Sequence, residues 1–305
     1  MKVANIIKNC KEKELAIMDL PDTQPLKNEI KVKVVKVPLT TGDVAMMNMG
    51  SKKQKVVGQF YSGEVVSLGR DVKEYKVGDR VCGMHKSGTL SEYINISNKS
   101  VIHRIPDEIS YEASVALLFG GSAALYFLKK TLNQKRKLWI LINGASGEVG
   151  LIALQLMKTY GHHVTAVSRN EKFAILEKYG ADRCIDYTQE KIEKYLDQYD
   201  VVFDAVGKLN VNREVAHMSK NSEFITTHVG LDLIGGIVKN WIFGRVKIKM
   251  GIAGFKKSDI ETLFSLYSVG GIKEVIDNRF ELKEINKALD RVKSGSKVGT
   301  VIIDL

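Results

Sequence analysis

Three glycines at regular spacing, Gly144, Gly147 and Gly150, form the part of this chain best suited to bind a phosphate group. In such a series the first glycine permits a sharp turn and the second lets the backbone approach an anion without a Cβ. The third lets a helix pack closely on the preceding strand. Ser146 and the pair Glu148–Val149 lie between them. The first N–H groups of the helix would then face the phosphates of a dinucleotide.

The flanking residues favour this interpretation over a tight turn without a ligand. An apolar run at 138–142 is typical of a buried strand, and 149–157 has the apolar spacing of an amphipathic helix. Gly161 then has the position of a helix C-cap. Strand, turn and helix together are the context in which a glycine pattern gains weight.

A second strand at 162–167 ends in Ser168, Arg169 and Lys172. Folds that bind NAD usually place an acid at this point to accept the ribose 2′-hydroxyl, and Ser168 occupies about that position. A small hydroxyl followed by two cations can instead bind a phosphate, which predicts NADPH as the cofactor. The alternative is that both cations are solvated charges at a helix start, but the missing carboxylate argues against it.

The elements that must position these residues alternate between strand and helix patterns. Such alternation predicts a doubly wound parallel sheet. Further strands are expected at 183–186, 200–204, 223–227 and 246–250, with helical patterns at 190–198 and 211–218.

The first third of the chain is different, because short β-rich runs separated by turn residues dominate it. Strands are expected at 30–37, 63–68, 80–83 and 92–97, which indicates an antiparallel, barrel-like domain. The last run, 298–304, also has strand character but no place in the parallel sheet, so we expect it to return to the first domain. The predicted domains are therefore 1–112 with 268–305, and 113–267.

Several motifs together resemble the medium-chain dehydrogenase/reductase superfamily, in its zinc-free quinone oxidoreductase branch. The match runs nearly from end to end. It rests on 31–34, 75–81, 88–93, 105–107, 143–150, 178–182 and 294–301.

The resemblance implies a GroES-like catalytic domain, a Rossmann domain, and a nicotinamide cofactor in the cleft between them. By position, Gly147, Glu148 and Val149 would face the pyrophosphate. The 2′-phosphate would be surrounded by Ser168, Arg169, Lys172 and Tyr187. Val206 and Gly207 would line the adenosine side, and His228, Val229 and Gly230 would approach the nicotinamide.

Zinc-binding relatives hold their metal with Cys and His, but the matching positions here are Thr40 and Gln59, neither a credible zinc ligand. The spacing of the three cysteines, Cys10, Cys82 and Cys184, fits no zinc motif. We therefore expect no metal. Without zinc to polarise a hydroxyl, the expected reaction is hydride transfer from NADPH to a quinone or to the C=C bond of an enone.

Two residues are candidates for a catalytic role. Thr40 has a hydroxyl that can donate to a substrate or cofactor oxygen, and Tyr61 has one that can donate a proton. A barrel-core aromatic is the favoured alternative for Tyr61. Asp43 fits a turn or helix cap better than a general base.

Composition limits the remaining classes. Apolar residues make up 44% of the chain, no run approaches the length of a membrane span, and the N-terminal residues lack the apolar run of a signal peptide. With few cysteines, this predicts a cytoplasmic protein without a membrane partner. The formal charge of +11 comes from scattered lysines, which disfavours nucleic acid. An NADPH-binding sensor or an RNA-binding protein with little catalysis stays open, as does a homodimer formed through 246–250.

Overall fold

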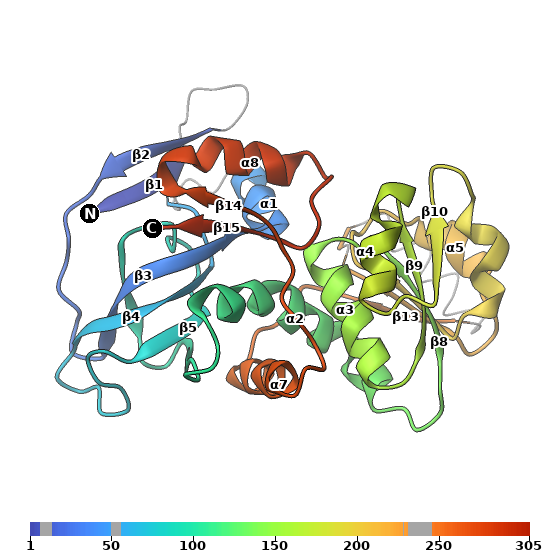
Figure 1. Ribbon diagram of the computed structural model, residues 1–305, viewed down its shortest axis with the longest axis horizontal. Coiled ribbons are helices and arrows are strands. Elements are labelled where there is room, and N and C mark those ends of the chain that lie inside the picture. The colour runs from blue at the N-terminus through green and yellow to red at the C-terminus, as the bar shows by residue number, and fades with distance from the viewer. Residues whose placement is uncertain (7–13, 50–55, 228, 231–245) are drawn as a thin grey trace. The chain divides into compact units, whose positions relative to one another are not determined.

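The computed structural model describes residues 1–6, 14–49, 56–227, 229–230 and 246–305 (Figure 1). It divides into two compact units. The first is Met1–Phe119, Phe255–Ser268 and Glu274–Leu305, and the second is Gly120–Gly254 and Val269–Lys273.

The unit boundaries differ from the predicted ones, since 113–119 and 255–267 group with the β-rich unit and 269–273 groups with the other. The reason is packing: Val115 and Leu118 share an apolar core with Phe264 and with Phe60 of the β-rich unit. The first turns of helix α2 (Tyr111–Leu132) are thus buried in the core of the β-rich unit.

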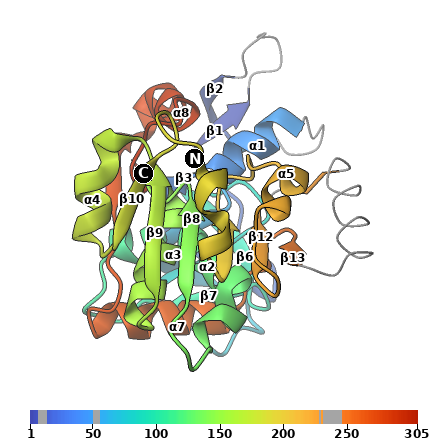
Figure 2. The ribbon, with the colours of Figure 1, turned by 90° about the vertical axis from the view of Figure 1, so that its right-hand side faces the viewer.

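The second unit is built on a six-stranded sheet in which every pair of neighbours is parallel (Figure 2). Its strand order is β10-β9-β8-β11-β12-β13. The chain leaves β8 in one direction to β9 and later in the other to β11, so β8 lies at the switch point where such sheets bind ligands. The strands are β8 (Trp139–Asn143), β9 (His163–Ser168), β10 (Arg183–Asp186), β11 (Val201–Asp204), β12 (Glu223–Thr226) and β13 (Lys247–Met250).

This arrangement confirms the predicted doubly wound sheet. The helices of this part of the chain are α2 (Tyr111–Leu132), α3 (Glu148–Thr159), α4 (Phe173–Lys178) and α5 (Val211–Ala216). Asn170–Lys172 forms the 3₁₀ helix η1, and the expected helix at 190–198 is the 3₁₀ helix η2 (Ile192–Gln198). By length and composition α2 would suffice to cross a membrane, but 78% of its most apolar window is buried, as in a core helix.

The first unit is β-rich, as predicted. Strand β15 (Thr300–Asp304) pairs antiparallel with β3 (Glu29–Leu39), which confirms that the last strand returns to this unit. The remaining strands are β1 (Lys2–Ile6), β2 (Leu15–Asp19), β4 (Phe60–Leu68), β5 (Arg80–Met84), β6 (Tyr93–Ser97), β7 (Val101–Arg104) and β14 (Ile276–Glu281). Its helices are α1 (Thr41–Met49), α7 (Lys257–Ser268), α8 (Ile285–Lys293) and the 3₁₀ helix η4 (Leu282–Glu284).

Helix α8 covers the β-rich core with one apolar stripe. Ile285, Ala288, Leu289 and Val292 are its buried residues, at the i, i+3, i+4, i+7 spacing of a single helix face. They join the cluster that contains Ile303 of β15.

Candidate cofactor-binding site

The turn between β8 and α3 has the backbone form that the glycine spacing predicts. Gly144 has a φ of +74°, and a Cβ there would lie 2.5 Å from Cγ1 of Val206. The Gly144 N–H donates to the carbonyl of Val167 at 3.1 Å. A side chain at 144 would therefore be strained by the backbone and blocked by Val206.

Gly150 is required by close packing within the protein. A Cβ at this position would lie only 2.3 Å from the carbonyl oxygen of Gly144. Gly150 thus lets the first turn of α3 approach the turn that precedes it, whereas the prediction for the third glycine was close packing on the strand itself.

Gly147 is different, because the protein itself leaves room for a side chain there. Its φ of −77° suits any residue, and a Cβ would make only an ordinary contact, 3.4 Å from the Gly144 oxygen. Gly147 is also the N-cap of α3 and has no side chain to satisfy the first-turn N–H groups. Glu148 is buried, so it offers the site its backbone rather than its charge. A glycine kept where the fold does not need one fits a phosphate in that space.

At the carboxyl end of β9, residues that were predicted to bind phosphate form hydrogen bonds with one another. The hydroxyls of Ser146 and Ser168 lie 3.0 Å apart, which ties the glycine turn to the end of the second strand. Arg169 is exposed, and its Nε donates to the Tyr187 hydroxyl at 3.0 Å. In the part of the chain that the structure describes, this is the only side-chain hydrogen bond of Arg169. The hydrogen bond raises the pKa of Arg169, so the cation stays charged.

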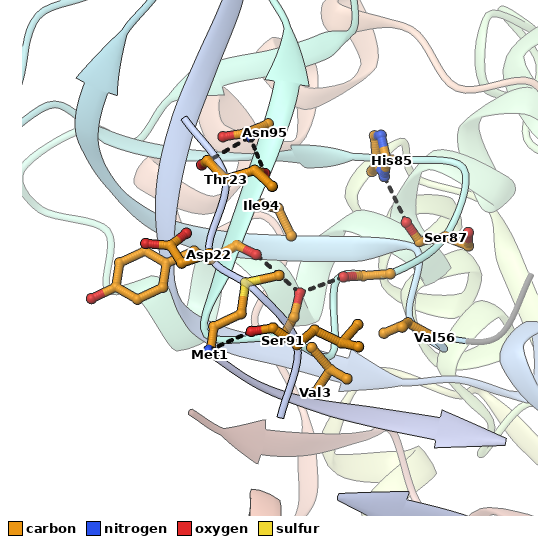
Figure 3. A pocket seen from close by; sticks show the side chains of 13 residues that line it. Met1, Val3, Asp22, Thr23, Val56, His85, Ser87, Ser91, Ile94 and Asn95 are labelled. Atoms are coloured by element: carbon orange, nitrogen blue, oxygen red, sulfur yellow. Dashed lines mark hydrogen bonds between the residues drawn. The ribbon is translucent and has the colours of Figure 1, made fainter. Parts of the chain in front are cut away.

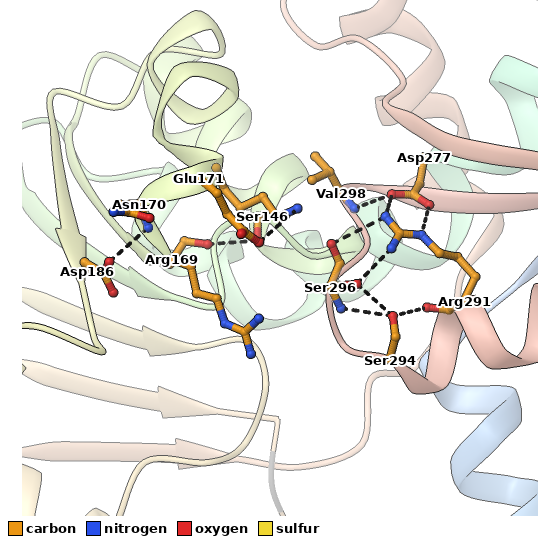
Figure 4. Close-up of polar contacts among 12 residues, drawn as sticks. Ser146, Arg169, Asn170, Glu171, Asp186, Asp277, Arg291, Ser294, Ser296 and Val298 are labelled. Atoms are coloured by element: carbon orange, nitrogen blue, oxygen red, sulfur yellow. Dashed lines mark hydrogen bonds and ion pairs between the residues drawn. The ribbon is translucent and has the colours of Figure 1, made fainter.

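Asp186, at the end of β10, is a site residue that sequence reasoning missed. Its carboxylate accepts the N–H of Asn170 at 3.1 Å (Figure 4). It also accepts both the N–H and the hydroxyl of Thr188, at 2.8 and 2.7 Å. The bonds from Thr188 hold the pKa of Asp186 below its usual range. The acid therefore fixes the loops that carry Arg169 and Tyr187. The signal for it was an Asp two residues before a Thr, the pattern of an Asx turn.

Lys172 is less available than the sequence suggested. Its Nζ lies 3.4 Å from a carboxylate oxygen of Glu171, and its side chain is only 18% exposed. The cation of this pair is therefore partly neutralised, and Arg169 is the stronger of the two predicted phosphate ligands.

The loops after β11 and β12 carry the remaining predicted contacts. Val206 and Val229 are about half exposed, and Gly207 has a φ of +67°. Gly230 is partly buried, and His228 lies outside the described residues. The contact of Val206 with Gly144 brings the adenosine-side loop to the glycine turn. The nicotinamide contacts of His228 to Gly230 stay predictions.

Thr40 is a helix cap in this structure, not a free donor. It precedes α1, its hydroxyl donates to Asp43 at 2.7 Å, and the same oxygen accepts the Asp43 N–H at 3.1 Å. The Thr40 N–H in turn donates to the Asp43 carboxylate at 2.9 Å. These reciprocal bonds make a capping box. The Thr40 proton is thus engaged and the residue is fully buried, which argues against donation to a substrate; that role stays a prediction.

Tyr61 is a core residue, which agrees with the favoured alternative and argues against a role as proton donor. The side chain is fully buried in the apolar cluster of the β-rich unit, with Val32 and Val81 among its members. Its hydroxyl has no hydrogen-bond partner among the described residues. Burial raises the pKa of Tyr61 well above its usual value, which opposes proton release.

We expect Tyr61→Phe to leave turnover within about twofold of the original, since the hydroxyl reaches no reacting atom. Stability should be unchanged or higher by about 1 kcal/mol, because the variant removes a buried, unsatisfied polar group. Steady-state kinetics and urea unfolding of both proteins measure these effects. A large fall in kcat with normal stability would restore Tyr61 as a proton donor.

One pocket of about 180 Å³ lies in the β-rich unit (Figure 3). In it, Nδ1 of His85 lies 2.6 Å from the carbonyl oxygen of Ser87. Val56, Ser91 and Asn95 are among its other lining residues. None of the predicted site residues lines this pocket.

The positions expected for zinc carry no metal-binding group. Thr40 is engaged as a cap, as described above, and Gln59 has an amide side chain. Across the described residues, no three His, Cys, Asp or Glu side chains are grouped to hold a metal ion. Burial raises the pKa of Cys82 and keeps it a neutral thiol.

Two family models match the chain. One is described as an alcohol dehydrogenase GroES-like domain and matches residues 26–107. The other is described as a zinc-binding dehydrogenase and matches residues 179–303.

Individual proteins are similar over most or part of the chain. The chloroplastic quinone-oxidoreductase QR1 of Triphysaria versicolor is 27% identical over 94% of this chain and 93% of its own length. The chloroplastic NADPH-dependent alkenal/one oxidoreductase of Arabidopsis thaliana is 34% identical over 59% of this chain and 50% of its own length. A crystal structure of Escherichia coli quinone oxidoreductase complexed with NADPH superposes with a TM-score of 0.86 at 22% identity, covering all of both chains.

Proposed function

We propose that this chain, which belongs to the medium-chain dehydrogenase/reductase superfamily and is quinone oxidoreductase-like, is a zinc-independent, NADPH-dependent reductase of quinones or of the C=C bond of enones. The observation that carries the proposal is Gly147, a glycine that leaves space for a phosphate where the fold itself would accept a side chain. That space lies at the N-terminus of α3, where the first-turn N–H groups of a helix favour an anion.

The choice of NADPH over NADH rests on the end of β9. No carboxylate stands there to accept a ribose hydroxyl, and Ser168 with the exposed Arg169 offers a hydroxyl and a cation instead. Asp186 is the nearest acid of the adjacent strand, and its carboxylate oxygens already accept hydrogen bonds from the Asn170 N–H and from Thr188. A 2′-phosphate therefore meets a positive charge rather than an unpaired carboxylate.

When bound, the cofactor supplies a hydride, which together with one proton reduces a quinone to a hydroquinone or saturates an enone. The chain binds and orients the cofactor through the α3 N-terminus, the contact of Gly144 with Val206, and Arg169. Neither Tyr61 nor Thr40 is assigned the proton, because both hydroxyls are buried. Positioning of the two reactants thus supplies much of the rate.

Relatives support both acceptor classes, since one is named as a quinone oxidoreductase and another as an alkenal/one oxidoreductase. The NADPH complex of the structural neighbour supports the cofactor. A cytoplasmic location and a homodimer formed through β13 stay predictions of the sequence.

Deuterium transfer tests this proposal. The purified chain is incubated with NADPH deuterated at the transferred position, together with an enone or a quinone, and the products are analysed by mass spectrometry. We expect one NADPH consumed per acceptor, with deuterium on the β-carbon of a reduced enone. Tight NADPH binding without reduction of any acceptor would contradict the reductase and favour a cofactor-binding sensor.

A further inference from the structure

A single buried carboxylate, that of Asp204, joins the ends of three neighbouring strands at the carboxyl edge of the parallel sheet. Asp204 is the last residue of β11 and is fully buried. Strands β8 and β12 flank β11, and Asn143 and Thr226 are the residues in register with Asp204. The loops of the proposed cofactor site begin directly after these three positions.

Both carboxylate oxygens of Asp204 are engaged. Oδ1 accepts Nδ2 of Asn143 at 2.9 Å and the Gly207 N–H at 3.1 Å. Oδ2 accepts the Leu209 N–H at 2.9 Å. Longer contacts of 3.4 Å come from the Thr226 hydroxyl and the Val206 N–H.

These bonds connect the phosphate turn with the adenosine-side loop. Asn143 immediately precedes Gly144, and Gly207 follows Val206, which packs against Gly144. The carboxylate therefore fixes two segments whose separation determines where a dinucleotide can lie. A charge without solvent exposure is stabilised only when several donors surround it. A buried apolar side chain at this position would need no hydrogen-bond donors around it. Phe203 and Phe224 are buried apolar residues nearby.

We infer that Asp204 is a positioning residue that holds the cofactor loops in their binding geometry. The inference rests on the proposed function. It concerns the part of the dinucleotide that NADPH and NADH share, since the bonds of Asp204 reach the glycine turn and the adenosine-side loop but not Arg169. Asp204 does not touch the reacting atoms.

Asp204→Asn tests this inference. An amide has one acceptor oxygen in place of two, so at least one of the three short bonds is lost and its donor faces an NH₂ group. We expect the Kd values for NADPH and NADH, measured by fluorescence titration of the full chain, to rise by the same factor, about tenfold. The KM for NADPH should rise accordingly, with kcat at saturating NADPH within about twofold.

The matched control lies at the other end of the same strand region. Asp200 precedes β11, and its carboxylate accepts the Trp139 N–H at 2.9 Å and an Arg136 N–H at 2.7 Å. Asp200→Asn likewise removes a carboxylate that accepts bonds from β8, but at the amino edge of the sheet. We expect it to lower the unfolding temperature and to leave both Kd values unchanged.

The inference is overturned if Asp204→Asn binds both cofactors like the original, if it changes their ratio, or if Asp200→Asn weakens binding equally. Should Asp204→Asn not fold, Asn143→Ala removes one donor alone, and we expect a rise of roughly threefold in both Kd values; no rise overturns the inference. If the chain without substitutions binds neither NADPH nor NADH, the proposed function itself is overturned. Binding without turnover contradicts only the reductase and leaves the role of Asp204 standing.

Discussion

Replacing Gly147 with valine is expected to raise the Kd for NADPH by about a hundredfold or more while the chain stays folded. The backbone at 147 accepts any residue, and the nearest atom beyond its neighbours is 3.4 Å from the new Cβ. The backbone and the Cβ of the new residue therefore fit the protein, and its side chain fills the space proposed for the phosphates. Fluorescence titration with NADPH and thermal unfolding of the same preparation measure the two effects.

Gly150→Val is the matched control, because its main expected effect is a loss of folding stability. Its Cβ would lie 2.3 Å from the Gly144 oxygen, so the first turn of α3 must move and the unfolding temperature should fall sharply. If Gly147→Val binds NADPH normally, the space at 147 holds no phosphate. If instead Gly147→Val unfolds, the glycine has a structural role that its surroundings do not show.

Replacing Arg169 with alanine is expected to weaken NADPH binding by about ten- to a hundredfold and to leave NADH binding nearly unchanged. Arg169 is exposed, and its only side-chain hydrogen bond within the described part of the chain goes to the neutral Tyr187 hydroxyl. Its charge is therefore available for the 2′-phosphate, the one group that distinguishes the two cofactors. Parallel titrations with NADPH and NADH give the ratio.

Lys172→Ala provides the comparison within the same cluster. The ion pair with Glu171 already engages this cation, so we expect a smaller loss, about two- to fivefold for NADPH. If Arg169→Ala lost affinity for NADPH and NADH equally, Arg169 would support the loop and would not bind the 2′-phosphate. A larger effect for Lys172 than for Arg169 would reverse the assignment of the two cations.

The parallel sheet and the glycine turn were predictable because their signals are local. All six strands lie within one residue of their predicted ranges, and Gly144 makes the sharp turn that the glycine spacing indicated. The return of 298–304 to the first unit was predictable by exclusion, since the strand had no partner in the parallel sheet.

Roles that depend on tertiary contacts were not predictable. Thr40 and Tyr61 carry chemically competent hydroxyls, but only the fold shows that one is consumed by a capping box and the other lies in an apolar core. Asp204 looked like a strand end in the sequence, because its partners come from segments far apart along the chain. The expected helix at 190–198 is a 3₁₀ helix anchored by Ile192 and Leu196, its two buried residues.

The most direct test of the central claim is NADPH oxidation by the purified chain against a panel of quinones and enones, with NADH run in parallel. We expect turnover with at least one acceptor class, and a far higher rate with NADPH than with NADH. Equal rates with NADH would contradict the phosphate role of Ser168 and Arg169. No turnover with either cofactor would contradict the reductase itself.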